Sequence, residues 1–210
     1  MIHSLPKVYP ITDVRLSGLS HAEQLAALHD GGATFVQLRE KAFSPLDFFQ
    51  QAMEAVAVAR ERDVRLIIND RADIALAVKA HGVHVGQDDL APEAVRRILR
   101  KEAIVGYSTH NVEQVRHALS LPIDYLAIGP IFPTSSKSDT EPVVGLEGVR
   151  AAARLAGALP IVAIGGITYE NASAVIEAGA SSVAMIGALL SDPSSISERT
   201  SQIIDLLGHR

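Results

Sequence analysis

A lysine and three hydroxyl side chains follow a Gly/Pro turn in the segment from Gly129 to Lys137, which reads GPIFPTSSK. An apolar run over residues 124–128 precedes this segment, and the polar run 135–141 follows it. We therefore expect the turn to lie at the end of a buried strand and at the mouth of a pocket. Hydroxyls and an ammonium group are good donors to phosphate oxygens. The segment predicts an enzyme for phosphorylated substrates.

Three polar side chains alternate in QLREK, namely Gln37, Arg39 and Lys41. Side chains alternate along an extended chain, so these three share one face, while Leu38 and Glu40 take the other. An amide beside a planar guanidinium and a compact ammonium suits a diphosphate joined to a ring with hydrogen-bonding edges. The alternative is a strand end whose cations form salt bridges with neighbours, with Glu40 as an obvious partner.

Two aspartates, Asp70 and Asp89, follow two successive apolar runs. If those runs are neighbouring strands, both carboxylates converge on one hard cation. Mg²⁺ is the expected ion, because it takes one or two carboxylates together with waters and substrate phosphate oxygens. The alternative is that Asn69-Asp70 and Asp88-Asp89 cap the helices that follow them.

Histidine and serine side chains mark two further runs. His84 lies inside an apolar run, so we expect it to point into the interior, either as a hydrogen-bonded core residue or as a contact of the substrate. Ser108 and His110 alternate in the same sense, and either side chain is able to reach the site. No residue pattern marks an acyl-transfer nucleophile, so no Ser-His-acid set is expected.

Small residues end the last two runs, at Gly165-Gly166 and at Ile186-Gly187. Glycine permits close approach of the backbone, so N–H groups here are predicted to bind a second phosphate. The alternative is a tight turn that needs glycine for its dihedral angles alone. A reaction that joins a diphosphate-activated group to a phosphorylated acceptor fits the two anion sites.

Eight short apolar runs must position these residues, and alanine-rich amphipathic stretches separate them. The runs are Val8 to Thr12, Thr34 to Leu38, Arg65 to Ile68, Val83 to Val85, Ile104 to Tyr107, Asp124 to Ile128, Ile161 to Ile164 and Ser182 to Ile186. The helical stretches include 46–62 and 91–100, each with a proline in its first turn.

This pattern predicts an α/β fold, a single-domain (β/α)8 barrel of the TIM-barrel type over residues 1–210, with the site at the carboxyl ends of the strands. A doubly wound open sheet is the alternative. It normally uses fewer strands, and the turn after the first run, TDVRLSG, contains no G-x-G-x-x-G motif.

Composition narrows the class of protein. The chain has 210 residues, 48% of them apolar, as in a soluble globular protein. It has no cysteine, no apolar stretch long enough to span a membrane and no signal peptide, so a cytoplasmic location is expected. The net charge of −5 and the few aromatic residues argue against a nucleic-acid partner.

Taken in order, eight motifs make the chain resemble the thiamine phosphate synthase (thiamine-phosphate pyrophosphorylase) family. They are YPITD (9–13), QLREK (37–41), IIND (67–70), GVHVGQDDL (82–90), GYSTH (106–110), GPIFPTSSK (129–137), VAIGGI (162–167) and SVAMIGA (182–188).

The resemblance implies that the protein couples 4-amino-2-methyl-5-hydroxymethylpyrimidine diphosphate to a thiazole phosphate by a dissociative mechanism that releases pyrophosphate. It implies Mg²⁺ as cofactor at Asp70 and Asp89. The implied contacts are Arg39, Lys41, Asn69, Ser108 and Lys137 for pyrophosphate, Gln37, His84 and Met185 for the pyrimidine, and Thr134, Ser136, Gly166, Ile186 and Gly187 for the thiazole phosphate. Lys137, Ser108, Arg39 and Lys41 are the expected catalytic residues.

The chain departs from the family pattern at two positions. The usual T-x-T-K reads TSSK here, and Gly187 stands where a serine is usual. A related branch, the thiazole tautomerases, uses a histidine at the position of His110, so an isomerase is one alternative. A non-catalytic sensor of phosphate ligands is another. Small-molecule substrates are the expected partners, and a homo-oligomer is compatible with the sequence.

Overall fold

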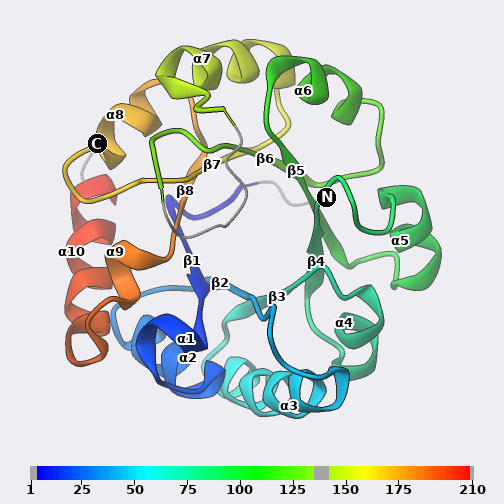
Figure 1. The fold of residues 1–210 in the computed structure, drawn as a ribbon, viewed down its shortest axis with the longest axis vertical. Coiled ribbons are helices and arrows are strands. Elements are labelled where there is room, and N and C mark those ends of the chain that lie inside the picture. The colour runs from blue at the N-terminus through cyan, green and yellow to red at the C-terminus, as the bar shows by residue number, and fades with distance from the viewer. Residues whose placement is uncertain (1–3, 135–141, 209–210) are drawn as a thin grey trace.

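All eight expected strands form one closed parallel barrel in the structure, a computed structural model that describes residues 4–134 and 142–208 (Figure 1). The strands are β1 (Val8–Thr12), β2 (Phe35–Leu38), β3 (Arg65–Asn69), β4 (Gly82–Val85), β5 (Ile104–Thr109), β6 (Tyr125–Ile128), β7 (Ile161–Ile164) and β8 (Ser182–Met185). Each agrees with its predicted run to within two residues. The predicted (β/α)8 fold is confirmed, and the open sheet is wrong.

Consecutive strands pair in register, and β8 closes the barrel against β1, with Val8 opposite Val183. Closure aligns the carboxyl ends of all eight strands at one rim. In a parallel barrel this rim carries the loops that lead into the helices. The polar residues at the strand ends are therefore brought together although they are far apart in the sequence.

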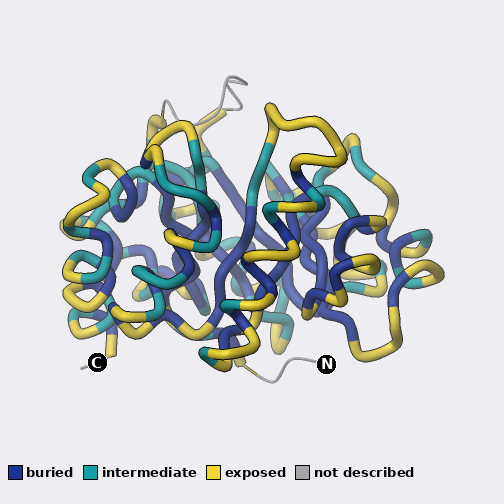
Figure 2. The backbone as a smooth tube through the Cα atoms, turned by 90° about the horizontal axis from the view of Figure 1, so that it is seen from below, coloured by how far each residue is buried: buried dark blue, intermediate teal, exposed yellow. Residues whose placement is uncertain are grey.

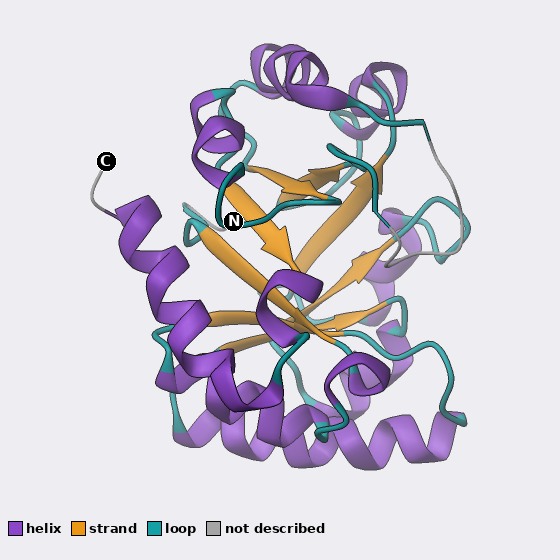
Figure 3. Ribbon diagram, turned by 60° about the vertical axis from the view of Figure 1, so that its left-hand side comes forward, coloured by secondary structure: helices purple, strands orange, loops and turns teal. Residues whose placement is uncertain are grey.

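Helices cover the outside of the barrel as a ring (Figures 1 and 3). They are α1 (Val14–Ser17), α2 (His21–Asp30), α3 (Pro45–Glu61), α4 (Ala72–Val78), α5 (Pro92–Ile98), α6 (Val112–Ala118), α7 (Gly145–Ala156), α8 (Ala172–Glu177), α9 (Gly187–Leu190) and α10 (Ile196–Gly208), with a 3-10 turn at Pro193–Ser195. The strands are buried on both faces, and exposed residues lie at the periphery (Figure 2).

Local sequence signals set where several helices begin. Ser20 and Glu23 form a capping box at the start of α2, each bonding the other's backbone N–H. Ser44 accepts a hydrogen bond from the Asp47 N–H, and Pro45 occupies the first turn of α3. The predicted helix 91–100 is shorter than expected, because the backbone is already extended at Leu99.

Aromatic rings fill part of the barrel interior. Tyr9, Phe35 and Tyr125 are at most 1% exposed, and their rings pack edge to face with centroids 4.7 to 6.4 Å apart. All three lie in the first half of their strands. They occupy the amino-terminal part of the interior and leave space for a ligand only toward the other rim.

In the described part of the chain, no helix is long and apolar enough to span a membrane.

Candidate active site

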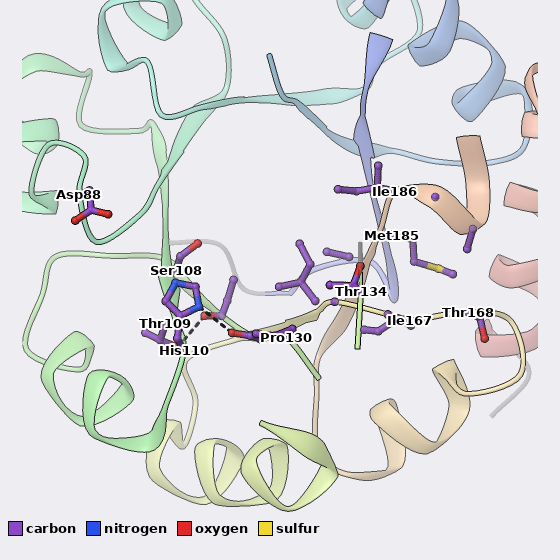
Figure 4. Close-up of a pocket in the computed structure, with 18 residues that line it drawn as sticks. Asp88, Ser108, Thr109, His110, Pro130, Thr134, Ile167, Thr168, Met185 and Ile186 are labelled. Atoms are coloured by element: carbon purple, nitrogen blue, oxygen red, sulfur yellow. Dashed lines mark hydrogen bonds between the residues drawn. The ribbon is translucent and has the colours of Figure 1, made fainter. Parts of the chain in front are cut away.

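A pocket of about 310 Å³ opens at the carboxyl ends of the strands (Figure 4). Its walls come from the segments that end or follow β4 to β8. Figure 4 shows Asp88, Ser108 and His110 on one side of the pocket and residues such as Thr134 and Ile186 on the other. The positions that the sequence singled out at the ends of β5 to β8 thus meet around this pocket, together with Asp88 after β4.

A second, smaller cavity of about 30 Å³ lies within the barrel, lined by side chains that include Gln37, Asn69 and His84. Ser108 lines both this cavity and the larger pocket. Of the expected pyrimidine contacts, Gln37 and His84 therefore lie on the inner side, whereas Met185 lines the larger pocket. Ser108 stands between the two spaces.

Glu40 does not neutralise the cations beside it. Its Oε1 accepts the backbone N–H groups of Lys41 and Ala42, at 2.7 and 2.6 Å, and its Oε2 lies 3.6 Å from Nε2 of His21. Burial lowers the pKa of His21, and the charge of Glu40 opposes that shift. The predicted separation of Glu40 from Arg39 and Lys41 is confirmed. The alternative, in which the cations of this strand end form salt bridges with neighbours, is also confirmed, but Glu40 is not their partner.

The two cations pair with aspartates instead. A guanidinium nitrogen of Arg39 lies 3.6 Å from a carboxylate oxygen of Asp13. The ammonium of Lys41 contacts a carboxylate oxygen of Asp70 directly, although the lysine is about half exposed. Lys41 thus reaches the carboxylate that the sequence assigned to a metal.

Asp70 sits in an unusual backbone conformation directly after β3, with φ of 62°. Non-glycine residues seldom adopt positive φ, and such strain clusters at functional sites. Burial raises the pKa of Asp70, as does the nearby carboxylate of Asp89, while Lys41 lowers it. The effect of Asp89 on Asp70 requires that the two carboxylates lie close together, as the neighbouring strands β3 and β4 predict.

Neither aspartate caps a helix. The residue before α4 is Arg71, which makes no side-chain capping bond, and α5 follows Ala91, which likewise makes none. Asp89 Oδ2 instead accepts the N–H of Gly86 at 2.7 Å and so closes the turn after β4. The capping alternative is wrong for both residues.

Two converging carboxylates fit Mg²⁺, which completes its coordination with waters and phosphate oxygens. In residues 4–134 and 142–208, no group of three or more His, Cys, Asp and Glu is arranged to hold a metal by itself. The donor set thus suits an ion that a phosphorylated substrate helps to bind. It does not suit a metal held by the protein alone.

Both ring nitrogens of His84 have partners inside the barrel. Nδ1 lies 3.0 Å from the hydroxyl of Tyr125, and Nε2 lies 2.8 Å from Oγ of Ser108. His84 is 6% exposed, so the predicted inward orientation is confirmed. Its contact with a substrate stays a prediction.

His110 lines the larger pocket with a defined tautomer. Its Nδ1 lies 2.8 Å from the carbonyl oxygen of Gly129, marked by a dashed line in Figure 4. A carbonyl only accepts hydrogen bonds, so Nδ1 carries the proton in the neutral ring and Nε2 keeps its lone pair.

Glycines at the end of β7 allow close approach of two loops. Gly165 and Gly166 have φ of 102° and 63°, and a Cβ on Gly166 would lie 2.6 Å from the carbonyl oxygen of Pro133. Both glycines also line the larger pocket, where α9 begins at Gly187. The positive φ values therefore explain only in part why glycine occurs here. A side chain at Gly166 would also collide with the facing loop at Pro133.

Two predicted contacts, Ser136 and Lys137, lie outside the described residues. Thr134, the last described residue of that segment, is exposed and lines the larger pocket. Sequence reasoning missed Tyr9 and Tyr125, which hydrogen-bond within the barrel interior. The available signal was a tyrosine hydroxyl inside each of two largely apolar runs.

The fold and the site define a (β/α)8-barrel protein whose carboxyl rim carries a pocket lined by polar, apolar and small residues, with the ion pair of Lys41 and Asp70 at the ends of β2 and β3. The chain belongs to the family described as thiamine monophosphate synthase, which it matches over residues 8–189.

Similar proteins cover nearly the whole chain. A thiamine-phosphate synthase of Koribacter versatilis is 47% identical over 211 residues, which is 97% of this chain and 96% of the relative. One from Albidiferax ferrireducens is 43% identical, with coverages of 95% and 92%. The structure of thiamine phosphate pyrophosphorylase from Pyrococcus furiosus is 32% identical and has a TM-score of 0.87, with coverages of 97% and 96%.

The likeness to more distant structures shows the fold alone. A tryptophan synthase α-subunit from Pyrococcus furiosus is 14% identical with a TM-score of 0.72, covering 99% of this chain and all of the other. At such low identity the likeness indicates architecture and carries no functional argument.

Proposed function

We propose that this enzyme is a transferase that couples 4-amino-2-methyl-5-hydroxymethylpyrimidine diphosphate to a thiazole phosphate, forming thiamine phosphate and pyrophosphate. One observation carries the proposal. A charged group, made of Arg39, Lys41, Asp70 and Asp89, and a small-residue wall at Gly166 and Gly187 lie at the same barrel rim. Family membership supports the same reaction.

The charged group suits the diphosphate. Arg39 supplies a planar fork and Lys41 a compact ammonium, and both lie in the first three residues after β2. Asp70 and Asp89 would hold Mg²⁺, which when bound supplies positive charge to the diphosphate oxygens. The diphosphate then offers Lys41 a second acceptor besides Asp70. If Lys41 turns toward the diphosphate, the mostly buried carboxylate of Asp70 is still paired with Mg²⁺.

The small-residue wall suits the acceptor. Gly166 and Gly187 bring backbone close to the pocket, and Thr134 adds a hydroxyl to the same lining. Apolar side chains of Ile167, Met185 and Ile186 line the space between, where two aromatic rings fit better than charged groups. We place the thiazole phosphate here, with Ser136 as a further expected contact.

The residues favour a dissociative reaction. The C–O bond to the diphosphate breaks with the electron pair on oxygen, and the lone pair of the thiazole nitrogen then forms the new C–N bond. Cations stabilise the departing pyrophosphate, which is the largest kind of contribution that such sites make. The hydroxyl of Ser108 is bonded to His84 inside the barrel and is not required as a nucleophile.

A pyrophosphate-release assay tests the proposal. The purified protein is given both substrates, each substrate alone, and both substrates with a chelator. Pyrophosphate is expected only with both substrates and Mg²⁺, together with an equal amount of thiamine phosphate. Binding of either substrate without any turnover would instead support the phosphate-ligand sensor.

His110 supports a second candidate, isomerisation of the thiazole phosphate. Its Nε2 lone pair is a proton acceptor beside the pocket, because Gly129 holds the proton on Nδ1. This reaction needs neither the pyrimidine diphosphate nor Mg²⁺. Conversion of one thiazole tautomer to the other in the presence of chelator, without pyrophosphate release in the complete assay, would favour it over the synthase.

A further inference from the structure

Five side chains form an unbroken hydrogen-bonded row through the barrel interior. Gln37 Nε2 lies 3.0 Å from the hydroxyl of Tyr9, and the hydroxyls of Tyr9 and Tyr125 are 2.9 Å apart. The Tyr125 hydroxyl lies 3.0 Å from Nδ1 of His84, whose Nε2 lies 2.8 Å from Ser108 Oγ. The row thus begins at an expected pyrimidine contact and ends at the wall of the larger pocket.

Counting protons gives the row a direction. Burial raises the pKa of Tyr9 and of Tyr125, so each keeps its one hydroxyl proton near neutral pH. Gln37 Nε2 is a donor, so the Tyr9 oxygen accepts from it and Tyr9 donates to Tyr125. Tyr125 then donates to Nδ1 of His84. If the row ran in the opposite direction, the buried Tyr9 proton would face the amide donor of Gln37 and have no acceptor. A buried donor without an acceptor costs free energy.

This direction settles the last bond of the row. A neutral imidazole that accepts at Nδ1 carries its proton on Nε2, so His84 donates to Ser108 Oγ. The proton of Ser108 is then not used inside the barrel. This proton is therefore available to a ligand in the larger pocket, which Ser108 also lines.

The backbone makes room for the Tyr125 to His84 bond at one position. Gly106 lies between these two residues in the sheet, opposite His84 on one side and opposite Tyr125 on the other. A Cβ at Gly106 would lie 2.1 Å from the Tyr125 ring and 2.4 Å from Nδ1 of His84. Glycine in the middle of a strand weakens it, so the missing side chain points to a use for this space.

We propose that Tyr125 is a positioning residue that fixes His84 as the Nε2–H tautomer, so that Ser108 presents its hydroxyl proton to an oxygen of the anionic substrate. Tyr9 and Gln37 set the direction of the row, and Gly106 gives it space. The role in turnover rests on the proposed function, whereas the tautomer of His84 does not.

Nuclear magnetic resonance of the ¹⁵N-histidine-labelled protein tests the tautomer without any substrate. The signal of His84 is identified by its loss in His84→Asn. The expected spectrum shows a protonated Nε2 and an unprotonated Nδ1. A protonated Nδ1, alone or in an imidazolium, would mean that the row runs the other way or is broken, and would overturn the proposal even if the synthase reaction is observed.

Two phenylalanine variants separate positioning from packing. Tyr125→Phe removes the proton given to His84, so mixed tautomers are expected, with kcat about tenfold lower and the KM of the thiazole phosphate unchanged. Tyr9→Phe leaves Tyr125 with Nδ1 as its only acceptor, so the tautomer is expected to persist. Loss of the tautomer in Tyr9→Phe, or its retention in Tyr125→Phe, would contradict the assigned direction.

A matched control lies on the same barrel. Tyr107 is buried next to Gly106 on β5 but takes no part in the row. Tyr107→Phe is expected to keep both the His84 spectrum and kcat. If Tyr125→Phe and Tyr107→Phe lower kcat equally while both leave the spectrum unchanged, the effect is general packing and the positioning role is wrong.

Discussion

Asp70 is the residue at which binding and stability oppose each other. It is mostly buried, carries a positive φ, and has its pKa raised chiefly by burial. The folded chain therefore binds this proton more readily than the unfolded chain does. The contribution of Asp70 to stability falls as pH rises from about 3.8 through the raised pKa, and it stays low above that value.

Asp70→Asn should separate the two effects. Asparagine tolerates positive φ and carries no buried charge, so we expect a higher Tm than that of the unchanged protein near neutral pH. The difference should shrink as pH falls below about 3.8, where Asp70 is protonated in both the folded and the unfolded chain. Turnover should fall about a hundredfold, because one ligand of the cation is lost. Thermal melts across this pH range provide the measurement, and a lower Tm at neutral pH would contradict it.

At Asp89 the negative charge can be removed while the hydrogen bond that closes the turn is kept. In Asp89→Asn the amide oxygen is still able to accept the Gly86 N–H, so the turn after β4 should keep its shape. We expect turnover to fall about a hundredfold with a change in unfolding free energy below about 1 kcal/mol. Asp73→Asn, at an exposed ion pair on α4, is the control and should keep full turnover. Equal turnover in the two variants would remove Asp89 from the site.

At the scale of elements, the turn from β2 to α3 depends on Glu40. This carboxylate holds two backbone N–H groups on the side of the turn away from the cations. Glu40→Ala should loosen the turn and raise the KM of the pyrimidine diphosphate about tenfold, because Arg39 and Lys41 are no longer held in place. Glu40→Gln retains an acceptor oxygen and should lose less. Identical KM values for the two variants would show that the turn does not need this bond.

The turn from β7 to α8 forms the part of the pocket wall that contains Gly166. Gly166→Ala forces a Cβ against the Pro133 carbonyl and should displace the segment that leads to Thr134. Gly18→Ala is a matched control, because Gly18 also has positive φ but has open space around it. Gly18→Ala should lose about 1 kcal/mol of stability through its positive φ alone, and Gly166→Ala should lose more, because its Cβ also clashes with backbone atoms. Only Gly166→Ala should raise the KM of the thiazole phosphate, and equal KM values would place that phosphate elsewhere.

At the scale of the whole molecule, barrel closure should make folding cooperative. Each strand pairs with both neighbours, and β8 returns to β1, so no subset of strands has a complete set of partners. We expect one thermal transition with a calorimetric to van't Hoff enthalpy ratio of about one. Scanning calorimetry measures this ratio. Two resolved transitions would contradict the single domain predicted over residues 1–210.

The sequence was sufficient for the fold because its signals are local and repeated. Apolar runs such as 161–164 cannot face water on either side, and eight of them separated by helical stretches leave few arrangements other than a closed parallel barrel. The strand boundaries also depend on pairing. The run at 104–107 continues through Thr109 as β5, because pairing with β6 extends the strand beyond its apolar part.

The sequence by itself also determined which residues gather at the carboxyl rim, since parallel strands carry their ends to one side. Only the tertiary structure decided how those residues pair. It shows that Glu40 faces away from the cations, that Lys41 reaches Asp70, and that a glycine lets Tyr125 bond His84. Residue order fixes which strand end carries a side chain, whereas partners across a barrel depend on register, burial and space, which no single stretch of sequence contains.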